Sequence, residues 1–124
     1  MDNQIVQSKP INQGINLGVI TIALLILVTI VSIYLSPISD PYIQRVLAAR
    51  GDVNSGYAIF KINCAGCHGV EADGNVGPNL HAVSKRRSKA RIIHQVISGE
   101  TPPMPRFQPN TQEMADLLVY LEGL

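Results

Sequence analysis

The chain contains no tryptophan, only two cysteines and few charged residues. Its cysteines, Cys64 and Cys67, are three positions apart, so a disulfide between them would close no long loop and would add little stability. The formal net charge is +1 with the histidines neutral, and so small a charge gives no indication of nucleic-acid binding. A length of 124 residues allows one small domain and one appendage, but not two ordinary domains.

Apolar residues are concentrated in one long, uncharged run from Leu17 to Leu35. That length is enough for a helix to cross the hydrocarbon core of a membrane. Tyr34 lies near the end of the run, where interfacial aromatic side chains are common, and Pro37 then ends the helix. The sequence predicts a transmembrane anchor over 15–35.

A cleaved signal peptide is the alternative interpretation of this run. Signal peptides have a shorter apolar region, followed closely by a small-residue cleavage site. The only pair of alanines after the run, Ala48 and Ala49, lies well beyond its end. We therefore expect a retained anchor, preceded by a disordered N-terminus over 1–14 and followed by a linker over 36–51.

The remaining segment, 52–124, is small enough that its apolar core would be thin. Domains of this size usually need a disulfide, a metal or a large cofactor for stability. Since the cysteines cannot close a long loop, a cofactor is the better candidate.

Three segments of this domain show helical periodicity, beginning at Asn54 or Ser55, at Ser88 and at Asn110. Their apolar stripes are Ala58, Ile59 and Ile62, supplemented by Phe60, in the first; Ile92, Ile93, Val96 and Ile97 in the second; and Met114, Leu117, Leu118 and Leu121 in the third. Glycines and Pro78 indicate a loop over 69–84, and four prolines exclude a regular helix over 100–109. No strand is evident, so we expect an all-α fold.

The sequence Cys64-Ala65-Gly66-Cys67-His68 is the pattern of c-type haem attachment. On a helical turn, the two thiols can form thioethers with the two vinyl groups of a porphyrin, and His68 is placed to meet the iron. Two alternatives remain for the bare motif. A thioredoxin-like redox pair needs a βαβ setting, and a zinc site needs further ligands, for which His81 and His94 are candidates at unusual spacings.

Met104 is the candidate for a sixth iron ligand, because prolines on both sides stiffen the backbone that presents it. The alternatives are that Met104 only fills the core, as methionines often do, or that His81 or His94 takes its place. Met114 lies on the apolar stripe of the last helix, where packing is the expected role.

Taken together, these motifs resemble class I cytochromes c, the small single-haem electron carriers, over 52–124. The matching elements are Gly56 and Phe60 before the motif, the motif itself, Gly77-Pro78-Asn79-Leu80, Pro103-Met104-Pro105 and the Leu117–Leu121 segment. The resemblance implies one covalent haem c on Cys64 and Cys67, with His68 and Met104 as axial ligands. It also implies that the Pro78 carbonyl accepts a hydrogen bond from the haem histidine, and that Gly56 lets the first helix cross the last near Tyr120. It implies an electron carrier and no enzyme, so no catalytic residue is expected.

More narrowly, the anchor, the Asp40-Pro41-Tyr42 segment and the run over 101–109 are similar to cyanobacterial cytochromes of the cM type. That resemblance implies a thylakoid or cytoplasmic membrane and a place in respiration or photosynthesis. The expected partners are membrane electron donors and acceptors (an oxidase, a cytochrome complex or a photosystem), membrane lipid around the N-terminal helix, and no nucleic acid.

The orientation in the membrane follows from the haem motif rather than from the charges. Lys9 lies on one side of the apolar run, while Arg45 and Arg50 lie on the other, which slightly favours the opposite orientation. Covalent haem attachment takes place on the non-cytoplasmic side. We therefore expect a cytoplasmic N-terminus and a lumenal or periplasmic haem domain.

One basic run, over 85–91, is the strongest charge feature of the chain. It is either a solvated helix start, a docking patch for an acidic redox partner, or a group of cations that offsets the haem propionates.

Overall fold

The computed structural model describes residues 12–35 and 39–124 of the chain. The disorder predicted for 1–11 and the linker prediction at 36–38 lie outside these residues. The chain divides into two compact units, Met1–Leu35 and Ser36–Leu124.

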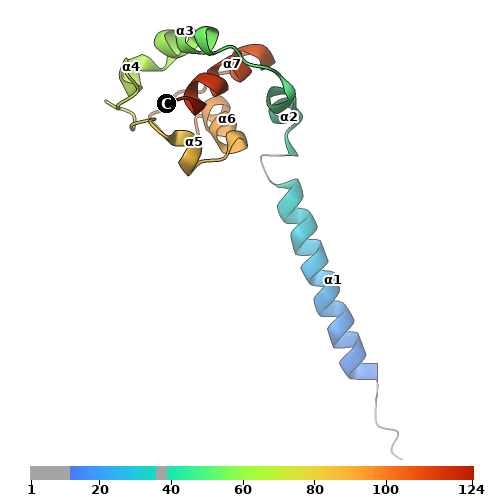
Figure 1. Cartoon of the computed structure of the whole chain (residues 1–124). Coiled ribbons are helices and arrows are strands. Elements are labelled where there is room, and N and C mark those ends of the chain that lie inside the picture. Colours follow the sequence, from blue (N-terminus) through green and yellow to red (C-terminus); the bar gives the residue numbers. More distant parts are fainter. Residues whose placement is uncertain (1–11, 36–38) are drawn as a thin grey trace, which may run out of the picture. The chain divides into compact units, whose positions relative to one another are not determined.

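The first unit contains one helix, α1 (Asn12–Tyr34), which is coloured blue in Figure 1. Disorder was predicted as far as residue 14, whereas the helix already begins at Asn12. Its segment Leu17–Tyr34 is long and apolar enough to cross a membrane, and no residue of it is buried within the structure. The hydroxyls of Thr21 and Thr29 donate to the carbonyls of Gly18 and Ile26, each over 2.8 Å. The two hydroxyls are therefore satisfied within the helix, as an apolar surrounding requires.

In its described residues the second unit contains helices and loops but no strand, which confirms the predicted all-α class. Its helices are α2 (Pro41–Ala48), α3 (Val53–Asn63), α4 (Ala65–His68), α5 (Val83–Arg86), α6 (Lys89–Ser98) and α7 (Thr111–Glu122). Helix α7 packs against α2, α3, α5 and α6, and its most extensive contact is with α3 (Figure 1). It is thus the central element of the domain.

Side-chain caps explain where the three predicted helices begin. The carboxylate of Asp52 accepts a hydrogen bond from the Ser55 N–H, so the first of them starts slightly earlier than expected. Ser88, where the second helix was expected to begin, is the cap of α6. Asn110, where the third helix was expected to begin, forms a capping box with Glu113 at the start of α7.

The crossing of α3 and α7 depends on Gly56. A Cβ atom at Gly56 would collide with the carbonyl of Asp116 and lie 2.8 Å from the Cβ of Tyr120. The implied close crossing near Tyr120 is therefore confirmed. Because Gly56 and Phe60 face α7 and are buried, the predicted stripe is wrong at Ala58, which is exposed, and at Ile62, which is 83% exposed.

The stripes predicted for the other two helices are confirmed. Ile92, Ile93 and Val96 of α6 are buried, with Ile97 partly buried against them. The four stripe residues of α7 are all buried, and Met114 is completely so, which agrees with the packing role expected for it.

Helix α2 is the main departure from the sequence prediction. A linker was expected over 36–51, but eight of these residues form a helix, with Pro41 in its first turn and Asp40 as its cap. Ile43 and Val46 of α2 are buried in the domain core. The Tyr42 hydroxyl donates to the Pro109 carbonyl over 2.8 Å. Two apolar side chains one helical turn apart were too short a pattern to reveal this contact.

Candidate haem-binding site

The cysteine motif directly follows α3 and forms the short helix α4. The Cys64 N–H donates to the Phe60 carbonyl over 2.8 Å, and the His68 N–H donates to the Cys64 carbonyl over 3.0 Å. The expected helical turn is therefore present and continuous with the end of α3. Both thiols are free; Cys64 is partly buried and Cys67 is exposed.

Burial raises the pKa of the Cys64 thiol to about 11, and the nearby Cys67 adds to this effect. The Cys64 thiol is accordingly protonated at neutral pH before attachment of the cofactor. This direction is opposite to the lowered thiol pKa of thioredoxin-like redox pairs.

The ring of His68 is buried and held by a backbone carbonyl. Its Nδ1 atom lies 2.8 Å from the carbonyl oxygen of Pro78. A carbonyl only accepts, so Nδ1 carries the proton and donates, and the lone pair of Nε2 remains available for a metal. The structure thus has the contact that the family resemblance implied.

The loop that supplies this carbonyl is tied to the motif at two further points. The Gly74 N–H donates to the His68 carbonyl and the Gly77 N–H donates to the Cys67 carbonyl, each over 2.7 Å. A Cβ at Gly77 would lie between 2.7 and 3.0 Å from three atoms of the His68 ring. Only a residue without a side chain lets the loop lie flat against the imidazole.

Arg86 also holds this loop through hydrogen bonds. Its guanidinium donates to the carbonyls of His81, over 2.8 Å, and Asn79, over 3.0 Å. These carbonyls lie just beyond Pro78 in the chain. Part of the basic run therefore has an intramolecular role, because Arg86 holds the loop and Lys89 forms an ion pair with Glu122 at 2.8 Å.

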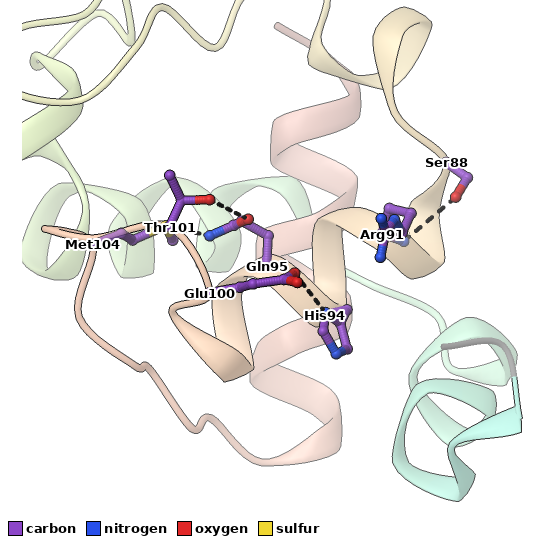
Figure 2. Close-up of polar contacts among 7 residues, drawn as sticks. All are labelled: Ser88, Arg91, His94, Gln95, Glu100, Thr101 and Met104. Carbon is purple, nitrogen blue, oxygen red and sulfur yellow. Dashed lines mark hydrogen bonds and ion pairs between the residues drawn. The ribbon is translucent and has the colours of Figure 1, made fainter. Parts of the chain in front are cut away.

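Met104 lies in the proline-rich segment after α6, which folds back along that helix. Gly99 ends α6 with φ +56°, where a Cβ would lie 2.8 Å from the Met104 carbonyl oxygen. Further along, the Phe107 N–H donates to the Val96 carbonyl over 3.0 Å. Figure 2 shows Met104 beside Gln95 of α6, whose Nε2 atom lies 3.5 Å from the Met104 sulfur.

One large cavity brings these parts together. Its volume is about 790 Å³, and its lining includes Cys64, Cys67, His68, Pro78 and Met104. Part of the remaining lining is apolar and comes from the core of the domain, namely Phe60, Ile92, Val96, Leu117 and Leu121. Arg86, Arg87 and Arg91 of the basic run also line the cavity. This volume lies within the range of ordinary cofactor sites, about 300–1,000 Å³. Two thiols, an oriented imidazole and a thioether around one apolar cavity fit a covalent haem.

The competing interpretations find no support in the described residues. His81 and His94 do not line the cavity, and His94 instead lies 3.6 Å from the Glu100 carboxylate. In the part of the chain that the structure describes, no group of three or more His, Cys, Asp or Glu residues is arranged to hold a metal ion. A zinc site at the motif would therefore lack its further ligands.

Sequence reasoning missed the contact of Arg86 with the loop and two contacts at the proposed ligands. Gly77 was noted only as part of a matching motif, and its contact with the His68 ring needs the fold of the loop. Gln95 lies on the polar side of a helix beside Val96, and nothing in its spacing indicates that it reaches Met104.

Comparison with known proteins agrees with this geometry. Residues 51–121 match the family described as cytochrome c oxidase, cbb3-type, subunit III. The chain is 64% identical over 85 residues to a protein of Synechocystis called cytochrome c-553-like, covering 68% of this chain and 81% of the relative. It is also 45% identical over 42 residues to a cytochrome c of Gibberella zeae, covering 32% of this chain and 40% of that protein. No solved structure matches the chain significantly.

The family match spans more than half of the chain, and the Synechocystis relative is matched over most of its length. The predicted resemblance to class I cytochromes c of the cyanobacterial cM type is thereby confirmed. The chain belongs to the cytochrome c family, and it is an electron carrier with a covalently bound haem c, not an enzyme.

Proposed function

We propose that this cytochrome is anchored in a membrane by α1 and carries single electrons between redox complexes of that membrane. Cys64 and Cys67 form the thioethers, and His68 and Met104 are the axial ligands. The observation that carries this proposal is the single cavity lined by all four residues. When bound, the haem supplies a one-electron redox centre.

The protein's own residues limit the rearrangement that accompanies electron transfer. The Pro78 carbonyl fixes the His68 ring and its tautomer, so Nε2 stays directed at one position. The buried apolar wall excludes water. With a histidine and a methionine both bound, no coordination position remains for a substrate, and methionine ligation together with burial raises the reduction potential.

The test of this ligand set is the ferric absorption spectrum of a Met104→Ala variant. We expect an altered spectrum and carbon monoxide binding to the reduced variant but not to the parent. Met114→Leu is the matched control, since Met114 is buried in the core, and its spectrum should equal that of the parent. An unchanged spectrum for Met104→Ala would exclude Met104 as a ligand, and carbon monoxide binding by the parent would favour a sensing role.

Support for the anchor comes from α1. Its span is uncharged, it is fully exposed in the structure, and its Thr21 and Thr29 hydroxyls are satisfied by the helix backbone. A removed signal segment is the alternative. Alkaline extraction of membranes distinguishes the two, because an anchored cytochrome stays with the lipid and keeps its N-terminal segment.

Helix α2 shortens the proposed tether. Since α2 packs on the haem domain, only residues 35–40 connect it to α1, and six extended residues span at most ~20 Å. This reach favours partners whose redox centres lie near the membrane surface. The Synechocystis relative supports a cyanobacterial source. The haem domain is then lumenal or periplasmic and the N-terminus cytoplasmic, in a thylakoid or cytoplasmic membrane, because covalent haem attachment takes place on the non-cytoplasmic side. An oxidase, a cytochrome complex or a photosystem would then be the partner.

A second candidate function is that of a fixed haem subunit in a larger oxidase, which the description of the matched family favours. Mild detergent extraction separates the candidates. A free carrier elutes as a small particle, whereas a fixed subunit co-purifies in constant ratio with a larger complex.

A further inference from the structure

Helix α2 contacts both helices that flank the segment carrying Met104. It packs against α6 and α7, and residues 99–110 connect these two helices. From α2, the Tyr42 hydroxyl donates to the carbonyl of Pro109, which is buried near the end of this segment. Two buried side chains hold α2 itself in the domain core. The first helix after the proposed anchor is therefore tied to the segment that presents the proposed sixth ligand.

The composition of this segment limits how its backbone can be held. Four of the residues over 100–109 are prolines, which have no N–H to donate. Beyond Met104, the Phe107 N–H donates to the Val96 carbonyl over 3.0 Å, and the Pro109 carbonyl then accepts the hydrogen bond from Tyr42 over 2.8 Å. One of these two attachments is made to α6 and the other to α2.

A small hollow lies beside the attachment to α2. Its volume is about 150 Å³, and it is lined by Tyr42, Ile97, Gln108 and Pro109. Side chains therefore do not fill the contact between α2 and the end of the segment, and a gap of this kind loses dispersion contacts. The hydrogen bond from Tyr42 consequently has a large share in holding α2 and the segment together.

Helix α2 lies outside the part of the chain that matches the cytochrome family. The match covers residues 51–121, whereas α2 is Pro41–Ala48. No residue of α2 lines the haem cavity. An effect of α2 on the site therefore has to pass through the segments that the helix holds.

Methionine is a flexible side chain, so its position depends on how firmly the backbone around it is held. We propose that α2 is a strap on the Met104 segment and that Tyr42 is a positioning residue: its hydroxyl holds the Pro109 carbonyl and so keeps the Met104 sulfur in the cavity. This inference rests on the proposed ligation by Met104.

The test is imidazole binding to the ferric, full-length holoprotein. Imidazole takes the sixth position only when Met104 leaves it, so its apparent affinity measures how often the segment opens. Tyr42→Phe should raise this affinity by roughly twofold to tenfold, as expected for the loss of one hydrogen bond. Tyr57→Phe is the matched control, since it removes the hydroxyl of an exposed tyrosine on α3, and its affinity should equal that of the parent.

Low concentrations of urea distinguish opening of the segment from a general loss of stability. Opening of one segment exposes little surface, so the affinities of Tyr42→Phe and the parent should keep a constant ratio below the unfolding transition. A steep rise of both affinities with urea would mean that imidazole enters through global unfolding, which would refute the strap.

In the Met104→Ala background, Tyr42→Phe should have no effect on imidazole binding, because no methionine has to leave. An equal effect with and without Met104 would overturn the strap, as would a Tyr42→Phe affinity equal to that of the parent. The Met104→Ala spectrum keeps the two proposals apart. If that spectrum changes while Tyr42→Phe has no effect, the ligand assignment stands and only the strap is lost; an unchanged spectrum removes both.

Discussion

Gly56 of α3 lies directly against the backbone of Asp116 in α7, with no room for a side chain between them. The start of α3 is also joined to the middle of α7, because the Asp116 carboxylate accepts a hydrogen bond from the Asp52 N–H over 2.8 Å. This crossing places Phe60 in the core and in the wall of the haem cavity. The first prediction concerns this contact.

Gly56→Ala should destabilise the folded holoprotein by about 1–3 kcal/mol, the usual cost of overpacking a well-packed core. The added methyl group forces the two helices apart, since backbone atoms cannot move aside as a flexible side chain can. Chemical denaturation followed by helical circular dichroism measures the change. Gly123→Ala is the control, because its nearest neighbour would lie at an ordinary 3.4 Å; equal losses in the two variants would refute the explanation.

Gly77→Ala should disturb His68 without unfolding the domain. Its methyl group would lie 2.7 Å from Cε1 of the imidazole, so the ring has to tilt away from the Pro78 carbonyl. We expect a lower yield of holoprotein and a partly high-spin ferric spectrum. Asn75→Ala, an exposed change in the same loop, should match the parent. A normal spectrum for Gly77→Ala would mean that the loop does not restrain the ring.

Tyr42→Phe should loosen α2 from the haem domain by about 1 kcal/mol, the net value of one hydrogen bond. Faster amide exchange in Pro41–Ala48, with unchanged exchange in α7, is the expected result. Exchange equal to that of the parent would show that Ile43 and Val46 alone hold α2.

The same tyrosine adds a pH dependence. Burial, followed by the charges of Glu113 and Asp40, raises the pKa of Tyr42 above its ordinary value of 10.0. The unfolded chain therefore loses this proton at a lower pH than the folded protein does, so stability falls as the pH rises from about 10 through the folded pKa. Tyr42→Phe should show a weaker loss of stability over this range, measured by denaturation at a series of pH values. An identical pH profile in both proteins would contradict this.

We expect Lys85 and Arg87 to speed the encounter with an acidic redox protein. Two other residues of the basic run, Arg86 and Lys89, are already engaged in contacts within the domain. The double variant Lys85→Gln, Arg87→Gln should slow reoxidation by membranes by roughly threefold to tenfold at low salt, and the difference should vanish at high salt. Lys89→Gln is the control for loss of a surface charge that is already paired. Equal rates for the double variant and the parent at low salt would exclude a docking patch at these two residues.

Local patterns were sufficient for much of the fold. Two helices begin where they were expected to, at Ser88 and Asn110, since a helix start depends on residues within one turn of each other. Ile62 was misplaced because apolar periodicity cannot tell which face of α3 approaches α7. Helix α2 was missed because its eight residues carry only two buried side chains, and only the core they enter shows that they matter.

By itself, the sequence determined the class of the protein. The Cys64–His68 motif, Met104 between its prolines and the three amphipathic helices are local features of the sequence. They can be recognised, and the haem chemistry inferred, without the structure. Only the tertiary structure decided how the site is held, because Gly77 on the His68 ring, Arg86 on the loop and Gln95 beside the Met104 sulfur are contacts between separate segments. Such contacts follow from how the helices pack, and no spacing along the chain encodes them.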